Sequence, residues 1–248
     1  MQTDDRVMVE NDGKKNLRGP LVGIAAAVAV LIAGSIFLLT RDDPEVATPA
    51  PNATALTGEF QPISPGAYYA DTDGDPETTP RGTFVIEDSG WGSIEAGAMK
   101  EGDSVDSGDY VSLFVVEVDR MWEAPCVGGT PVPAGTTAKA LGDQFAGMPD
   151  FITREGLRSV SAFGRDGYHL VLEVPGGCTG DSSNVWTSPV WGERLYQEEG
   201  QIVEYWFLDV EGTTVMVEAT RPPESDEEIA AELAADLDTV LDTLVITP

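Results

Sequence analysis

The longest apolar run of the chain covers residues 21–39 and contains no charged side chain. As a helix, this run of 19 residues would be about 29 Å long at ~1.5 Å per residue, close to the thickness of the hydrocarbon core of a bilayer. A core helix of a soluble domain would have one polar face, and this segment has none. The pattern therefore predicts a transmembrane helix over residues 21–40, with the lipid bilayer as its partner.

The charges beside this helix predict its orientation. The basic residues Lys14, Lys15 and Arg18 precede it, whereas acidic residues dominate the segment that follows. Basic flanks stay on the cytoplasmic side of a membrane. We therefore expect residues 1–20 to form a short cytoplasmic tail and everything after the helix to be extracytoplasmic, so that the protein is a single-pass protein of the cell membrane.

A cleaved signal peptide is the alternative interpretation of the apolar run. Signal peptides usually have an apolar region of about 7–15 residues, followed closely by small residues at the cleavage site. Residues 40–44 read Thr-Arg-Asp-Asp-Pro and contain no such site, and no cysteine near the run offers a point for lipid attachment. We favour an uncleaved anchor.

The chain after the anchor divides into a linker and one domain. Residues 41–56 are rich in proline, alanine and threonine, a composition typical of an extended linker. Residues 57–248 are long enough to form one domain with its own core. Within this domain, residues 202–210 and 213–220 are predicted to form a hairpin with a two-residue turn. The first of these strands is apolar on both sides, as in a central strand covered on both faces.

Other strands follow from shorter apolar or alternating runs. A second hairpin is predicted over residues 157–163 and 168–174, with Asp166 and Gly167 in its turn. His169 lies on the less apolar face of that hairpin, where we expect it to be half-exposed. Further strands are expected at residues 66–70, 82–87, 110–118, 193–196 and 244–246.

Two segments have the spacing of amphipathic helices. The first covers residues 136–147, and the second begins at a capping box made by Ser225 and Glu228 and continues with apolar residues at helical spacing to Leu244. Hairpin-linked strands with segregated helices indicate an α+β fold. The predicted fold is thus α+β, a mainly antiparallel sheet with two helices, preceded by one N-terminal transmembrane helix.

The charge balance narrows the possible partners. The chain has 14 Lys and Arg residues against 43 Asp and Glu residues, which gives a formal net charge of −29. Such a chain repels phosphate backbones, so nucleic-acid binding is excluded as a main function. With 42% hydrophobic residues, most of the chain can form a packed core.

Cys126 and Cys178 are the only cysteines of the chain. Both follow the predicted anchor, and two thiols outside a membrane are expected to pair. Two independent free thiols are the alternative. A redox-active pair is disfavoured because the chain has no Cys-x-x-Cys motif.

The acidic segment around Asp71, Asp73 and Asp75 offers oxygen ligands for Ca²⁺. An EF-hand loop that starts at Asp71 needs glycine at its sixth position and glutamate at its twelfth, where this chain has Pro76 and Gly82. We therefore expect a solvated hairpin connection and no tight metal site, and we keep the three aspartates as candidates only. No other pattern implies a cofactor.

Motifs for catalysis are missing from the sequence. It has no Gly-x-Ser-x-Gly, no His-Glu-x-x-His and no phosphate-binding Gly-rich loop. Carboxylates are numerous enough for glycoside hydrolysis, but no pair stands out. Trp186 and Trp191 lie in a loop-like segment and are the candidates for an exposed ligand-binding platform, whereas Trp206 is expected in the core.

Several short segments resemble a group of functionally uncharacterised proteins of actinobacteria. They are residues 64–71, 81–84, 90–91, 125–126, 133–137, 174–175, and 200–201 leading to 208–212. The group consists of single-pass, membrane-anchored extracytoplasmic proteins. The resemblance implies this location and topology for most of residues 64–248, but it implies no active site, because the shared motifs are turns and strands.

Three functions fit these patterns. The first is a noncatalytic, envelope-associated module that binds a protein, a glycan or a small ligand. The second is an assembly factor of a membrane complex that contacts its partners through the transmembrane helix. The third is a carboxylate-dependent hydrolase. The sequence leans towards the first, and away from an enzyme.

Overall fold

The computed structural model describes the following residues of the chain: 50, 52–56, 60–75, 80–94, 96–102, 109–178, 183–195, 198–223 and 227–248. The predicted tail, the transmembrane helix and most of the linker lie outside these residues. Among the residues that are described, no helix is long and apolar enough to cross a membrane.

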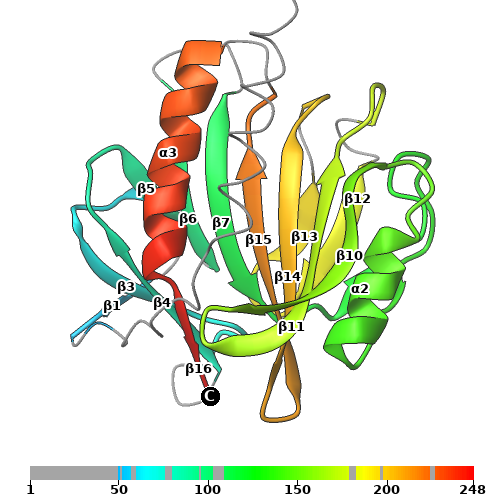
Figure 1. Cartoon of the computed structure of the whole chain (residues 1–248), viewed down its shortest axis with the longest axis horizontal. Coiled ribbons are helices and arrows are strands. Elements are labelled where there is room, and N and C mark those ends of the chain that lie inside the picture. The colour runs from blue at the N-terminus through cyan, green and yellow to red at the C-terminus, as the bar shows by residue number, and fades with distance from the viewer. Residues whose placement is uncertain are drawn as a thin grey trace, which may run out of the picture. The chain divides into compact units, whose positions relative to one another are not determined.

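An eight-stranded antiparallel sheet forms the centre of the described part of the chain (Figure 1). In spatial order its strands are β10 (Ile152–Ala162), β11 (Arg165–Glu173), β14 (Ile202–Val210), β15 (Thr213–Arg221), β7 (Tyr110–Val116), β6 (Gly97–Glu101), β5 (Trp91–Ile94) and β2 (Gln61–Pro62). Strand β10 therefore forms one edge of this sheet.

Two four-stranded sheets accompany the central sheet within the described residues. One has the order β1 (Thr54–Ala55), β3 (Gly66–Asp71), β4 (Arg81–Ile86) and β16 (Val245–Thr247), and the other has the order β13 (Gly192–Leu195), β12 (Asn184–Ser188), β8 (Arg120–Met121) and β9 (Val132–Pro133). The pairing of β1 with β3 is parallel, and the other pairings are antiparallel. The predicted α+β class with a mainly antiparallel sheet is confirmed.

The first predicted hairpin is confirmed in both its register and its burial. Val210 pairs with Thr213, so that Glu211 and Gly212 form a two-residue turn with positive φ angles. Alternate residues of β14 then pack into two different hydrophobic clusters: Tyr205 and Phe207 in one, Leu208 and Val210 in the other. The strand is thus covered on both faces, as its sequence predicts.

Helix α2 (Ala138–Ala146) packs against strands β10, β11 and β14. Its apolar stripe, Ala138, Leu141 and Phe145, is buried as predicted. The side chain of Thr137 accepts a hydrogen bond from the backbone N–H of Ala140 and caps the helix. Asp209 of β14 accepts a hydrogen bond from the backbone N–H of Ala138, and this contact fixes the start of the helix against the sheet.

Helix α3 (Glu227–Thr243) covers the other face of the central sheet, where it contacts β7 and β15, and it also contacts β4 of the first four-stranded sheet (Figure 1). Its predicted apolar stripe is confirmed, since Leu233, Leu237, Val240 and Leu241 are buried. Ser225 of the predicted capping box lies outside the described residues.

The second predicted hairpin exists, but its predicted turn was wrong. The turn is made by Phe163 and Gly164, both with positive φ, and Ala162 pairs with Arg165. Asp166 and Gly167 belong to strand β11. A Cβ atom on Gly167 would lie 2.1 Å from the carbonyl oxygen of Phe207, so this glycine serves the close approach of two strands and not a turn.

Candidate functional site

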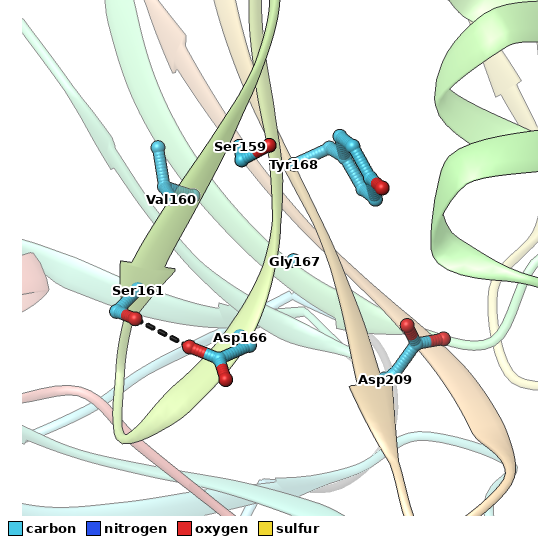
Figure 2. Close-up of a pocket in the computed structure, with 7 residues that line it drawn as sticks. All are labelled: Ser159, Val160, Ser161, Asp166, Gly167, Tyr168 and Asp209. Carbon is cyan, nitrogen blue, oxygen red and sulfur yellow. Dashed lines mark hydrogen bonds between the residues drawn. The ribbon is translucent and has the colours of Figure 1, made fainter.

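An open depression of about 430 Å³ lies at the end of strands β10, β11 and β14, beside helix α2 (Figure 2). Seven residues line it: Ser159, Val160, Ser161, Asp166, Gly167, Tyr168 and Asp209. Three of them carry hydroxyl groups and two carry carboxylates. It is therefore a polar surface with one aromatic ring.

The register of the strands brings the polar residues together. Ser159 pairs with Tyr168 and Ser161 pairs with Asp166 across β10 and β11. Side chains two residues apart on a strand share one face, so these four side chains all lie on the face that α2 also occupies. Asp209 joins them from β14, the next strand of the sheet.

The two carboxylates are held in place by neighbouring groups. The hydroxyl of Ser161 donates a hydrogen bond to Asp166, drawn as a dashed line in Figure 2. Asp209 accepts the hydrogen bond from Ala138 at 3.2 Å and so lies at the positive end of the α2 dipole. Both carboxylates retain further lone pairs. They can therefore accept hydrogen bonds from an ammonium, a guanidinium or the hydroxyls of a polyol.

No basic side chain is among the described residues that line the depression. Lys139 lies on the neighbouring helix α2, and its Nζ atom lies 2.7 Å from Oδ2 of Asp143. Its charge is thus already paired on the helix surface. The depression keeps a negative charge that favours a cationic or hydroxyl-rich ligand.

Trp186, predicted as an exposed platform residue, is fully buried, and that prediction was wrong. Its Nε1–H donates to Oε2 of Glu218 at 2.7 Å, and Nε of Arg194 donates to Oε1 of the same carboxylate at 2.8 Å. The guanidinium also lies over the ring of Phe114, 4.7 Å from its centroid. Burial alone would lower the pKa of Arg194, but the charge and hydrogen bond of Glu218, together with those of Tyr110, outweigh it and hold that pKa above its ordinary value. This buried network joins β12 and β13 to the central sheet.

Trp191, the second predicted platform residue, is half-buried. Its ring packs edge-on against Phe114, with 5.0 Å between the centroids. It is therefore part of the rim of the core. The structure brings neither tryptophan to the depression beside α2.

The three aspartates of the acidic segment do not converge. Asp71 Oδ1 accepts a hydrogen bond from Nε of Arg81 at 2.8 Å, and Asp73 accepts one from the backbone N–H of Asp75, as in a turn. Burial raises the pKa of Asp71, although the charge of Arg81 opposes that shift. Among the described residues, no group of three or more His, Cys, Asp or Glu side chains has the geometry to hold a metal ion.

His169 is buried and not half-exposed as the sequence predicts, because the ring of Trp206 lies 5.0 Å away. Its Nε2 atom lies 3.3 Å from Oε2 of Glu204, and Nε of Arg221 donates to the other oxygen of that carboxylate at 2.9 Å. Burial alone would raise the pKa of Glu204, but the hydrogen bond from His169 and the charge of Arg221 outweigh it and lower that pKa. Trp206 itself is half-buried and packs on the α3 side of the sheet, so its predicted place at the core is only partly correct.

The predicted disulfide between Cys126 and Cys178 is confirmed, with 4.5 Å between the two Cα atoms. It ties the segment before α2 to the segment after β11. Both sulfurs pack with the hydrophobic cluster on the α2 face, so that the covalent link supports the same face that carries the depression.

The sequence alone did not single out Asp166, Tyr168 or Asp209 as site residues. The available signal was the alternation in β11: with His169 on the less apolar face of the hairpin, its neighbour Tyr168 belongs on the more apolar face, where the structure places it. Asp166 was assigned to a turn, and the contact of Asp209 with α2 joins residues 71 positions apart. Such a contact has no local signature in the sequence.

No known family profile matches the chain, and no curated protein is significantly similar to it. Among solved structures, the chain is similar to LpqN, described as involved in cell envelope biogenesis of Mycobacterium tuberculosis. The likeness has a TM-score of 0.35 and 11% sequence identity, and it covers 77% of this chain and 91% of that one. A likeness of this size carries no argument about the function of this chain.

Proposed function

We propose that the chain is a membrane-anchored extracytoplasmic binding module that is noncatalytic and associated with the cell envelope. The apolar segment 21–40 supplies the anchor, with the N-terminus in the cytoplasm. The disulfide between Cys126 and Cys178 supports the extracytoplasmic location, because disulfides persist in oxidising compartments.

The depression beside α2 is the observation that carries the binding role. It is open, and polar side chains from three strands line it. Asp166 and Asp209 are both engaged in structural hydrogen bonds, and the chain's sole histidine packs on the opposite face of the sheet with Trp206. This arrangement supports recognition of a ligand by fixed hydrogen-bond acceptors, without a cofactor, more than acid–base chemistry.

The natural partner in this proposal is a protein or glycan of the envelope. Site-specific photocrosslinking in intact cells tests it, with benzoylphenylalanine placed at Ser159 in the full chain. Ala235 on the exposed side of α3 is the matched control position. The proposal predicts discrete adducts from position 159 and none from position 235. Absence of adducts at 159, or the same adducts at both positions, would contradict it.

A further inference from the structure

The outer side of strand β10 is a free sheet edge among the described residues, because β10 is the terminal strand in the sheet order. The strand has 11 residues, and most of them are exposed. A free edge presents unpaired backbone N–H and C=O groups to which another extended chain can add. Register shifts flank Glu155, so regular pairing is confined to the second half of the strand, from Arg158 onward.

The hairpin geometry identifies which backbone groups of β10 point outward. Ala162 and Arg165 flank a two-residue turn and therefore form a hydrogen-bonded pair. Such pairs alternate along the strands, so Val160 bonds inward to β11, whereas the backbone groups of Ser159 and Ser161 point away from the sheet. The hairpin of β14 and β15 gives the same result. Val210 and Thr213 flank its two-residue turn, and the alternation traced from this pair across β14 and β11 again directs Val160 inward and Ser159 and Ser161 outward.

These two serines also line the depression. A strand added to β10 would place its alternate side chains on the same face as those of Ser159 and Ser161. Asp166 then lies two strand spacings away, about 10 Å between Cα atoms. Because the serine side chains are small, the long stem of a lysine or arginine can pass over them and reach this carboxylate.

The charge of the surface selects the kind of segment that can add. The lining residues supply two carboxylates and no cation, and the chain as a whole has a net charge of −29. Charge complementarity favours a basic partner and disfavours a second copy of this acidic chain. An extended basic segment therefore satisfies both the free backbone groups of β10 and the nearer carboxylate of the depression, Asp166.

We infer that the edge of β10 binds an extended segment of a partner protein by strand addition, with lysine or arginine at alternate positions directed to Asp166. This inference rests on the proposed binding function and specifies its partner class. The backbone of the segment bonds to Ser159 and Ser161, and its basic side chains occupy the depression beside α2.

The test uses the full chain in nanodiscs and three labelled hexapeptides. The first alternates valine and lysine, the second has glutamate in place of lysine, and the third is the first peptide with alternate backbone amides methylated. Fluorescence anisotropy should show binding of the first peptide that weakens with salt. The second and third peptides should bind at least tenfold more weakly, because one has the wrong charge and the other cannot add as a strand.

Variants of the chain separate the backbone contribution from the side-chain contribution. Ser161→Pro removes an outward N–H without removing a bond to β11, since proline is tolerated at such edge positions, and Ser161→Ala is its matched control. We expect the proline variant to lose binding, whereas the alanine variant, which keeps the backbone N–H and loses only the hydrogen bond to Asp166, should bind much more tightly than the proline variant. Asp166→Asn should weaken binding about tenfold, as loss of one charge-assisted hydrogen bond does, and Asp88→Asn on a distant exposed bend should leave it unchanged.

Several results would overturn the inference. They are equal binding of the glutamate or methylated peptide, unchanged binding by the proline variant, and a dimer of the chain that the proline substitution dissociates. Thermal unfolding of each variant shows whether it is folded. If peptide binding fails while crosslinks at Ser159 persist in cells, the partner class is wrong and the binding function stands; loss of those crosslinks removes the function itself.

Discussion

Arg194→Met should destabilise the domain more than any other single change of a charged residue discussed above. The guanidinium is almost fully buried, and its partner Glu218 has no exposed surface. Methionine keeps much of the side-chain volume but leaves the carboxylate without its countercharge. Removing one partner of a buried ion pair costs about 3–5 kcal/mol.

The structure indicates why the cost should lie in this range. Arg194 donates to Oε1 of Glu218 at 2.8 Å and to the hydroxyl of Thr220 at 3.1 Å, and it also packs on the ring of Phe114. Trp186 still donates to the other carboxylate oxygen at 2.7 Å and the hydroxyl of Thr220 donates to Oε1 at 3.4 Å, so the lone charge keeps hydrogen bonds but loses its countercharge. For a domain of roughly 150–250 residues, a loss of 3–5 kcal/mol lowers Tm by about 6–20 °C.

Urea and thermal unfolding of the solubilised full chain, followed by tryptophan fluorescence, measure this loss. Arg158→Met is the matched control, because Arg158 is exposed and pairs with Glu155 at 3.5 Å; it should cost less than about 1 kcal/mol. The double variant Arg194→Met with Glu218→Gln removes both charges and keeps an acceptor for Trp186, so it should recover more than half of the loss. A cost for Arg194→Met no larger than that of the control would refute the reasoning.

The remaining predictions concern the disulfide, a close strand contact and acid stability. Replacing Cys126 and Cys178 by alanine should lower the free energy of unfolding by about 4 kcal/mol, as measured in urea, since their separation of 52 residues sets the loop entropy; an unchanged midpoint would contradict this. Gly167→Ala should cost roughly 1–3 kcal/mol by overpacking against β14, whereas Gly156→Ala, with open space around its Cβ position, should be close to neutral. Because the pKa of Glu204 is lowered in the folded state, its stabilising contribution is present above its unfolded pKa and is lost as the pH falls through the folded value; Glu204→Gln should therefore destabilise at neutral pH and have little effect in acid, and an equal effect at both would count against the assignment.

The fold was largely predictable from the sequence because its central strands carry strong local signals. Alternation in β14 and β15 gave their register and their two buried faces, and the apolar stripe of α3 gave its packing side. The turn of the second hairpin was not predictable from local preference. Gly167 resembles a turn glycine, and only the close approach of β14 shows why glycine is needed there.

The candidate site was much less predictable, because it forms where three strands and a helix meet. Trp186 lies in a segment that contains serine, proline and glycine, and so resembles an exposed tryptophan of a loop. Its burial depends on Glu218, which is 32 residues away and accepts the indole N–H. His169 was likewise misplaced, since the residues that bury it come from other strands. The burial of Trp186 and His169 depends on residues from other strands, and the periodicity within a single strand does not indicate which strands will be its neighbours.

Protease accessibility in intact spheroplasts tests the membrane topology most directly. The full chain carries an epitope tag at its N-terminus, and protease is added before and after the membrane is permeabilised. With an anchored extracytoplasmic topology, protease removes the domain after residue 41 in intact spheroplasts, while a tagged fragment of the tail and anchor stays in the membrane. A domain protected until permeabilisation, or a soluble chain that begins shortly after residue 40, would contradict the anchored extracytoplasmic topology.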